Sequence, residues 1–271
     1  MLRIIEKRLN NVLSIKTLVS CRLYKTLCLL GFLGFSASSI ALDDGTWTYT
    51  VAGDVVTVTG CVNDCPTDLV IPDNIDGRPL VSIANAAFPE SYLTSVTIPD
   101  SITHIGEYAF FANQLTSVTI PNSVTNIGDS AFDSNKLKSV TIPDSVIDIG
   151  QRSFRNNHLI TVTMGNSLTR IGDLAFVNNW LTSVTIPDSV TSIGEITFSE
   201  NNLTEVIFLG DRATLDTSWR PFLNNSALST INYCEDRNGW PGESIFGIAN
   251  IVSVICNDID GDGVHGTPDL L

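Results

Sequence analysis

One 22-residue segment recurs five times without a gap, and this regularity restricts the fold more than any other feature of the chain. A unit this short cannot bury its own apolar face, whereas stacked units share a continuous core. The sequence therefore predicts a solenoid of about seven coils. The regular copies start at Leu93, Leu115, Leu137, Leu159 and Leu181, with a looser copy from Leu69 and a degraded one from Leu203.

Each copy begins with the pattern L-x-x-V-x-I, which predicts a short strand. In the first copy, Val96 and Ile98 face the core with the leading leucine, while Ser95 and Thr97 alternate to the outside. Pro99 ends the strand, because proline has no N–H to donate to a neighbour. Stacking the copies places these strands in a parallel sheet on one face of a mainly β molecule.

The second half of each copy contains three rows of identical residues. A recurring glycine indicates either a positive φ angle or tight packing. A recurring phenylalanine predicts an internal stack of rings, and a recurring asparagine is placed to bond backbone groups of the adjacent coil. An apolar pair, Ile102 and Ile105 in the first copy, begins the return path. The rows are Gly106, Gly128, Gly150, Gly172 and Gly194; Phe110, Phe132, Phe154, Phe176 and Phe198; and Asn113, Asn135, Asn157, Asn179 and Asn201.

The pattern L-x-x-V-x-I-P-x-S-V-T-x-I-G-x-x-A-F-x-x-N resembles the leucine-rich repeats of BspA-like and treponemal surface proteins over residues 69–209. The resemblance implies a curved solenoid with a β-sheet on its concave face. It also implies a secreted or surface-attached protein that binds host or neighbouring-cell partners and has no enzymatic activity. The asparagine row replaces the cysteine often found at this position in the family.

Both ends of the repeat region need caps that cover the terminal coils. Residues 42–68 predict an N-terminal β-hairpin cap, because segments 46–51 and 55–59 alternate apolar and polar residues around a turn. The solenoid is expected over 69–233 and a C-terminal cap loop over 234–256.

Four cysteines remain once the first 41 residues are set aside, and they allow three pairings. The repeat region should hold the two pairs beyond disulfide reach of each other. We therefore expect Cys61–Cys65 and Cys234–Cys256. The alternative is a pair of metal half-sites, although no histidines cluster beside them.

Residues 1–41 are typical of a secretory signal peptide: a basic segment, an apolar stretch over 27–35 and an exit of small residues ending at Ala41. A short membrane anchor is the alternative. Removing this segment changes the net charge from −14 to about −19. Such an acidic surface repels nucleic acid and anionic membranes.

The acidic tail, residues 257–271, resembles a thrombospondin type 3 or dockerin calcium loop. Calcium loops supply oxygen ligands at alternating positions and at position twelve. The alternative is a simple acidic tail without a bound ion. The expected calcium ligands are Asp258, Asp260, Asp262, the Val264 carbonyl and Asp269.

The predicted function is a secreted or cell-surface protein that presents a face for protein–protein interaction or adhesion. The sequence contains none of three common catalytic or ligand-binding motifs: a G-x-S-x-G, a phosphate-binding glycine loop or a zinc-spaced histidine pair. We therefore expect the chain to have no enzymatic activity. The alternatives are a structural spacer for further C-terminal domains, or ice or crystal-surface binding through Ser/Thr ladders.

The candidate binding face combines the outward strand positions with one neighbouring row that varies from copy to copy. An exposed row with tyrosine and tryptophan is typical of binding hot spots, and the alternative is a row of unconstrained turn residues. The varying row is Tyr92, Gln114, Lys136, His158, Trp180 and Asn202. The candidate face is Tyr92, Thr94, Ser95, Thr97, Thr116, Ser117, Thr119, Lys136, Lys138, Thr141, His158, Trp180, Thr182 and Thr185.

Overall fold

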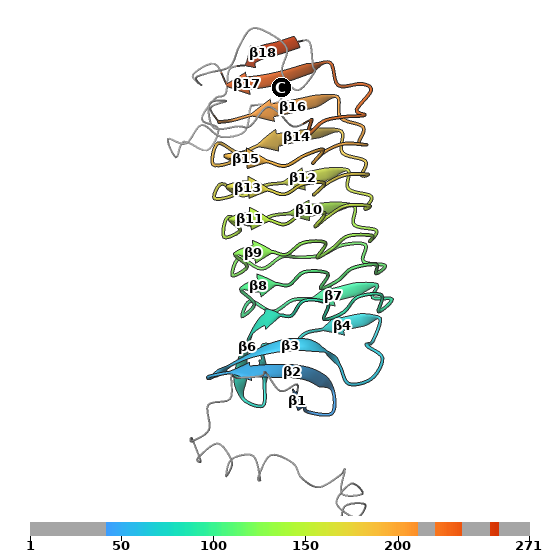
Figure 1. The fold of residues 1–271 in the computed structure, drawn as a ribbon, viewed down its shortest axis with the longest axis vertical. Coiled ribbons are helices and arrows are strands. Elements are labelled where there is room, and N and C mark those ends of the chain that lie inside the picture. Colours follow the sequence, from blue (N-terminus) through green and yellow to red (C-terminus); the bar gives the residue numbers. More distant parts are fainter. Residues whose placement is uncertain (1–41, 211–219, 235–249, 255–271) are drawn as a thin grey trace, which may run out of the picture. The chain divides into compact units, whose positions relative to one another are not determined.

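The computed structural model describes residues 42–210, 220–234 and 250–254. These residues form strands and turns, without a helix, in a column of stacked coils of about eight turns at a 22-residue period (Figure 1). The predicted β-solenoid is confirmed, with about one turn more than the sequence indicated. The expected signal peptide and the calcium-loop tail lie outside the described residues.

The L-x-x-V-x-I segments form the predicted parallel ladder, called the first ladder below. Its strands pair in registers that follow the repeat, as in Val140 opposite Val162. The ladder consists of three hydrogen-bonded pieces, with one break at residues 117–120 between β7 and β10 and a second between β12 and β14. Its strands are β4 (Asp68–Val70), β7 (Ser95–Thr97), β10 (Ser139–Thr141), β12 (Thr161–Thr163), β14 (Ser183–Ile186), β16 (Glu205–Phe208), β17 (Thr230–Cys234) and β18 (Asn250–Val254).

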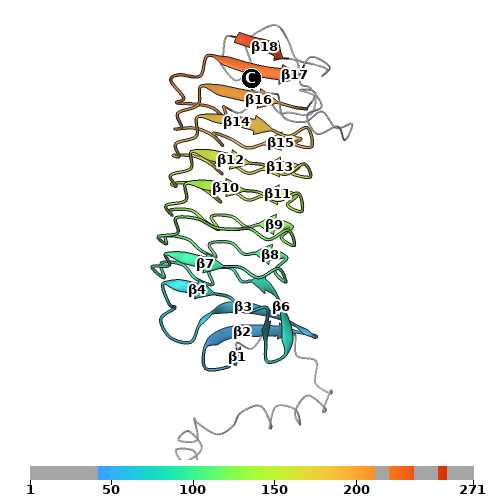
Figure 2. The same ribbon diagram turned by 180° about the vertical axis from the view of Figure 1, so that it is seen from behind.

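A second parallel ladder, which the sequence did not predict, runs beside the first (Figure 2). It arises from the T-x-I positions that were expected only to begin the return path. In each of its strands an isoleucine is buried and the residue before it faces outward or is half-buried. Two residues are too few to give an alternating pattern in the sequence. Its strands are β8 (His104–Ile105), β9 (Asn126–Ile127), β11 (Asp148–Ile149), β13 (Arg170–Ile171) and β15 (Ser192–Ile193).

The N-terminal cap extends the second ladder. The predicted hairpin is present, with strands pairing antiparallel, and its second strand pairs parallel with β6, which in turn pairs with β8. The resulting sheet has the order β1-β2-β3-β6-β8-β9-β11-β13-β15, with β5 beside β6. The cap strands are β1 (Leu42–Asp43), β2 (Trp47–Ala52) and β3 (Val55–Cys61), and the looser first copy contributes β5 (Asn74–Ile75) and β6 (Arg78–Ile83).

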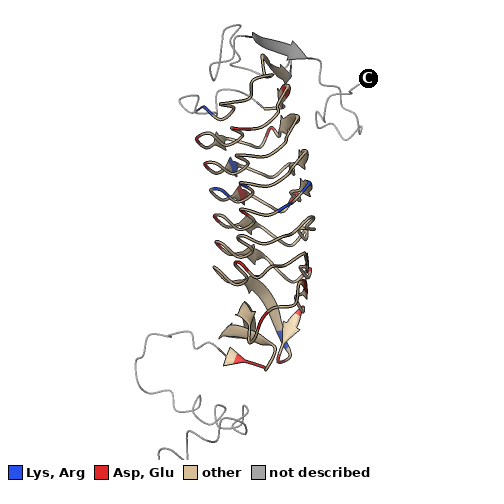
Figure 3. Cartoon of the chain, turned by 90° about the vertical axis from the view of Figure 1, so that its right-hand side faces the viewer, with Lys and Arg blue, Asp and Glu red and all other residues tan. Residues whose placement is uncertain are grey.

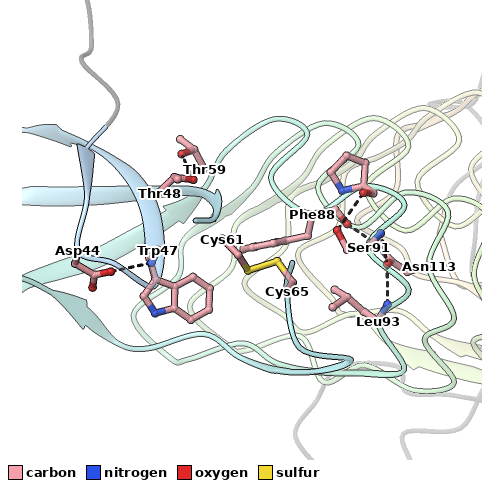
Figure 4. Close-up of a disulfide and its surroundings, with 11 residues drawn as sticks. Asp44, Trp47, Thr48, Thr59, Cys61, Cys65, Phe88, Ser91, Leu93 and Asn113 are labelled. Carbon is pink, nitrogen blue, oxygen red and sulfur yellow. Dashed lines mark hydrogen bonds between the residues drawn. A yellow bond between two sulfur atoms is a disulfide. The ribbon is translucent and has the colours of Figure 1, made fainter. Parts of the chain in front are cut away.

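The expected Cys61–Cys65 disulfide joins the end of this hairpin to the first coil (Figure 4). The Thr59 hydroxyl donates a hydrogen bond to that of Thr48 at 2.9 Å, which ties the two hairpin strands together. At the other end, β18 lies within the expected cap loop over 234–256 and continues the first ladder by pairing with β17. Cys256 lies outside the described residues, so its pairing with Cys234 stays a prediction.

The phenylalanine row forms the predicted internal stack. Neighbouring rings lie nearly parallel, with the centroids of Phe110 and Phe132 5.3 Å apart. The stack begins one coil earlier than the regular copies, at Phe88, and ends at Phe222. Trp47 of the hairpin meets Phe88 edge-on, so the N-terminal cap closes the aromatic stack as well as the sheet.

The asparagine row bonds the backbone of the preceding coil, as predicted. The Asn135 Oδ1 atom accepts the Leu115 N–H at 3.1 Å, and its Nδ2 atom donates to the Phe110 carbonyl at 2.9 Å. Both contacts are buried, so the side chain satisfies backbone groups that no strand reaches. Asn225 makes the same contact with Leu203 N–H at 3.0 Å across two additional residues, which is why the sequence pattern missed it.

Tight packing explains the recurring glycine, the second of the two readings that the sequence left open. Among the glycines of the described residues, positive φ angles occur only at Gly45, Gly53, Gly60 and Gly77, none of which belongs to the recurring row. A Cβ atom on Gly128 would lie 2.6 Å from the Glu107 backbone nitrogen, and the corresponding glycines meet the preceding coil in the same way. The glycine row therefore sets how closely successive coils approach.

Each coil also makes two left-handed turns that the sequence did not predict. Tyr108 and Ala112 in the first regular coil both have positive φ angles, as do their equivalents in later coils, including the β-branched Ile196. Their N–H groups donate to carbonyls of the next coil, as in Tyr108 to Asp129 at 2.8 Å. Residues with these side chains seldom adopt positive φ angles. The inter-coil hydrogen bonds stabilise the conformation here.

Candidate binding face

The first ladder determines which side chains face outward. Its apolar positions are buried or half-buried, whereas the Ser and Thr positions between them lie at the surface. We call this surface the hydroxyl face. Of the candidate residues, Tyr92, Thr94, Ser95, Thr97, Thr116, Ser117, Thr119, Lys136, Lys138, Thr141, Trp180 and Thr182 are exposed, and His158 and Thr185 are half-buried.

The varying row, called the outer row below, has a fixed backbone. The Lys136 N–H donates to the Leu115 carbonyl at 2.9 Å, and the Trp180 N–H donates to the Leu159 carbonyl at 2.9 Å. Gln114, His158 and Asn202 make equivalent bonds. Successive outer-row side chains therefore emerge about 4.8 Å apart along the stack, whatever their chemistry.

The outer row brings two of its aromatic side chains together and leaves the third apart. The rings of His158 and Trp180 stack with centroids 4.4 Å apart and planes 13° from parallel. Tyr92, which is 73% exposed, lies four coils away, about 20 Å along the stack. It borders a separate recess of about 590 Å³ that also contains Cys61 and Cys65. The predicted tyrosine–tryptophan row is thus two distinct locations.

Most hydroxyls of the face have no hydrogen-bond partner within the part of the chain that the structure describes. At its N-terminal end, Asp68 accepts hydrogen bonds from Thr94 at 3.0 Å and Ser95 at 2.8 Å. In the next copies, side chains such as those of Ser117 and Thr141 make no hydrogen bond with the described residues. These groups are available to water or to a ligand.

Charge is distributed unevenly between the hydroxyl face and the rest of the acidic chain. Lys136 and Lys138 are the only lysines among the described residues. Figure 3 shows the basic positions gathered mainly in the middle coils, whereas carboxylates recur along the stack. Asp68 and Glu205 stand at opposite ends of the first ladder's regular part. Between them, neither aspartate nor glutamate occurs in segments 92–98, 114–120, 136–142, 158–164 and 180–186.

The second ladder carries a shallow groove of about 380 Å³ that the sequence analysis did not single out. Outward residues of successive strands line it, among them His104, Asn126, Asp148 and Arg170. The Arg170 guanidinium pairs with the Asp148 carboxylate at 3.0 Å, so part of its charge is neutralised. The residue at x of the T-x-I-G pattern differs from copy to copy and lines this groove. That variation was the one indication of this surface in the sequence.

Within residues 42–210, 220–234 and 250–254, no group of three or more His, Cys, Asp or Glu side chains is placed to hold a metal ion. None of those segments forms an apolar helix of membrane-spanning length. The expected calcium ligands from Asp258 to Asp269 lie outside the described residues.

Residues 81–205 match, in six copies, the family described as the BspA type leucine rich repeat region. The match spans just under half of the chain. It covers the five regular copies and part of the looser one, so these coils are similar to leucine-rich repeats of the BspA type. No curated protein matches the chain.

Several solved bacterial structures are similar to this one. The pneumococcal vaccine antigen PcpA is 21% identical with a TM-score of 0.56, over 79% of this chain and 67% of that one. A leucine rich cell surface protein from Faecalibacterium prausnitzii is 18% identical with a TM-score of 0.48, over 80% and 95%. A leucine-rich repeat protein from Bacteroides ovatus is 20% identical with a TM-score of 0.34, over 79% and 76%. The likeness to PcpA supports the solenoid fold.

Proposed function

We propose that this chain is an exported, non-catalytic binding protein whose hydroxyl face and outer row contact another protein outside the cell. The observation that carries the proposal is the outer row. Its backbone is held at regular intervals, its side chains reach the surface, and their chemistry differs in every coil. Exposed tryptophan and tyrosine are enriched among residues that dominate protein–protein binding energy.

Two features support export: the signal-like segment over residues 1–41 and the Cys61–Cys65 disulfide. The signal-like segment precedes the solenoid, and the Cys61–Cys65 disulfide suits an oxidising compartment. Expression of the full chain in an exporting bacterium should release a protein that begins after Ala41, as measured by mass spectrometry of its N-terminus. Recovery of the intact chain from the membrane fraction would favour the anchor instead.

A pull-down tests the contact surface. Full-length protein with Trp180→Ala and Tyr92→Ala should capture less of its extracellular partners than the unaltered protein, because the largest exposed side chains are gone. Ile147→Ala is the matched control, since Ile147 is apolar and as exposed as Trp180 but lies directly before β11 of the second ladder. Equal capture by all three proteins would remove the outer row from consideration.

We also propose that the tail over 257–271 binds calcium through the residues expected above. The support is the spacing of its carboxylates, which follows the ligand positions of calcium loops. Calorimetric titration of the full chain should show calcium binding that Asp260→Ala abolishes and that chelator reverses. Unchanged binding by Asp260→Ala would reduce the segment to an acidic tail.

A further inference from the structure

Two residues in adjacent coils interrupt the repetition of the hydroxyl face. The strand-entry position is threonine in four coils, but lysine at 138 and isoleucine at 160. Beside these two, the outer row presents its one lysine, its histidine and its tryptophan. We call Lys136, Lys138, His158, Ile160 and Trp180 the central patch. In a chain built of copies, such a group of singular side chains marks a location with its own chemistry.

The central patch is contiguous over three successive coils. The Ile160 N–H donates to the Lys138 carbonyl at 2.9 Å, so these two residues are direct neighbours across the ladder. His158 joins the next coil through its ring stack on Trp180. At about 4.8 Å per coil, the patch extends about 10 Å along the stack.

The lysines and the indole N–H of the patch have no acceptor among residues 42–210, 220–234 and 250–254. Neither Lys136 nor Lys138 forms an ion pair, since both ion pairs of the described residues involve arginine. The Trp180 indole N–H has no hydrogen-bond partner among those residues. No carboxylate lies on the surrounding strand segments. Cations and N–H donors without an acceptor are complementary to an anion.

An apolar component accompanies this positive charge. Ile160 is 47% exposed and Trp180 is 49% exposed, although every other coil has a polar residue at the position of Ile160. An apolar anchor beside charged groups is typical of the energetic centre of a protein–protein interface. An acidic polysaccharide would use the lysines but would gain little from the isoleucine.

We propose that the central patch binds an acidic segment of a partner protein, in which carboxylate side chains flank an apolar side chain. This inference rests on the proposed binding function and specifies the chemistry of the partner. The rest of the chain is acidic and repels such a segment at long range. At physiological salt that repulsion is screened within about 8 Å, so the patch selects its partner at contact.

Synthetic peptides test the chemistry directly. Fluorescence anisotropy with the full chain compares three peptides of one length and one apolar content, whose charged positions are all glutamate, all glutamine or all lysine. The glutamate peptide should bind and the other two should bind at least about tenfold more weakly. Absence of binding by the glutamate peptide at millimolar concentration overturns the proposal.

Paired variants separate the patch from net charge. Lys136→Gln with Lys138→Gln should weaken glutamate-peptide binding about tenfold, because two exposed ion pairs are lost. Thr191→Glu with Ser192→Glu changes the net charge by the same amount at the start of β15 and directly before it, and should leave binding unchanged. Ile160→Ser should also weaken it. Equal loss in both double variants, or no loss in either, overturns the proposal.

Two further outcomes identify a different occupant. Polygalacturonate serves as an acidic polysaccharide probe, and its lysine-dependent binding in place of the glutamate peptide overturns the assignment to a protein segment. In the pull-down, loss of capture with Trp180→Ala but not with the lysine variant would leave the proposed binding function standing and remove this inference. Unfolding midpoints equal to that of the unaltered protein confirm that each variant is folded.

Discussion

Two adjacent rows of the solenoid obey opposite rules. Asn157 and His158 are neighbours in the sequence, yet the first belongs to a row that is the same in every regular coil and the second to a row that never repeats. The asparagine is buried and contacts the coil before it, whereas only the backbone of the outer row does so. An inward residue must therefore fit its copies on either side. An outward residue is free to carry specificity.

The largest effect is expected from the middle of the phenylalanine stack. Phe154→Ala removes a fully buried ring that stacks on Phe132 and Phe176 at 5.4 Å. It should lower the free energy of unfolding by about 4 kcal/mol, measured by urea denaturation. Trp180→Ala, an equally large truncation at the surface, is the control. Similar losses in both proteins would contradict the comparison between inward and outward rows.

The glycine row should be the next most sensitive. Gly128→Ala places a Cβ atom 2.6 Å from the Glu107 backbone nitrogen and forces two coils apart. The expected loss of unfolding free energy is about 3 kcal/mol. Asn126→Ala, two residues earlier and half-buried, should lose much less. An unaltered midpoint for Gly128→Ala would show that the coil spacing is not set by this row.

A smaller loss of unfolding free energy should follow the removal of one side chain from the asparagine row. Asn157→Ala leaves the Leu137 N–H and the Phe132 carbonyl without their bonds at 3.0 and 2.9 Å. The free energy of unfolding should fall by about 2 kcal/mol. The exposed Asn166→Ala serves as control, with an expected change within about 0.5 kcal/mol. If the two variants unfold alike, the buried side-chain bonds do not stabilise the stack.

The smallest effects on stability are expected in the outer row. Tyr92 has a φ angle of 58° and is largely exposed, and asparagine tolerates this left-handed conformation well. Tyr92→Asn should therefore keep its unfolding free energy within about 0.5 kcal/mol of the original, or slightly above it. A marked fall in the unfolding midpoint would mean that the outer row stabilises the fold and is not free to vary.

The repeat made much of the interior predictable. The phenylalanine and asparagine rows recur at one spacing, so their mutual contacts followed once stacking was assumed. The hairpin cap and the Cys61–Cys65 disulfide were predicted from local patterns. Twelve of the fourteen candidate-face residues are exposed and His158 and Thr185 are half-buried, and strand alternation directs the threonines to one side. That these residues bind a partner stays a prediction.

Other features had no local signature. The left-handed turns use residues such as Arg152 and Ile196, which rarely adopt positive φ, and their reason lies in hydrogen bonds to the next coil. The second ladder consists of two-residue strands that carry no alternation. The groove beside His104 and Asp148 follows from that ladder and was missed with it.

The sequence by itself determined that this chain stacks into a solenoid, which residues fill its interior and where its N-terminal cap lies. A residue that repeats every 22 positions meets its own copy in the next coil, so periodicity alone specifies those contacts. Only the tertiary structure decided how closely the coils approach, that a second ladder forms, and that His158 and Trp180 stack while Tyr92 stands apart. These features depend on the path of the backbone between the repeated positions, and many different side chains are compatible with that path.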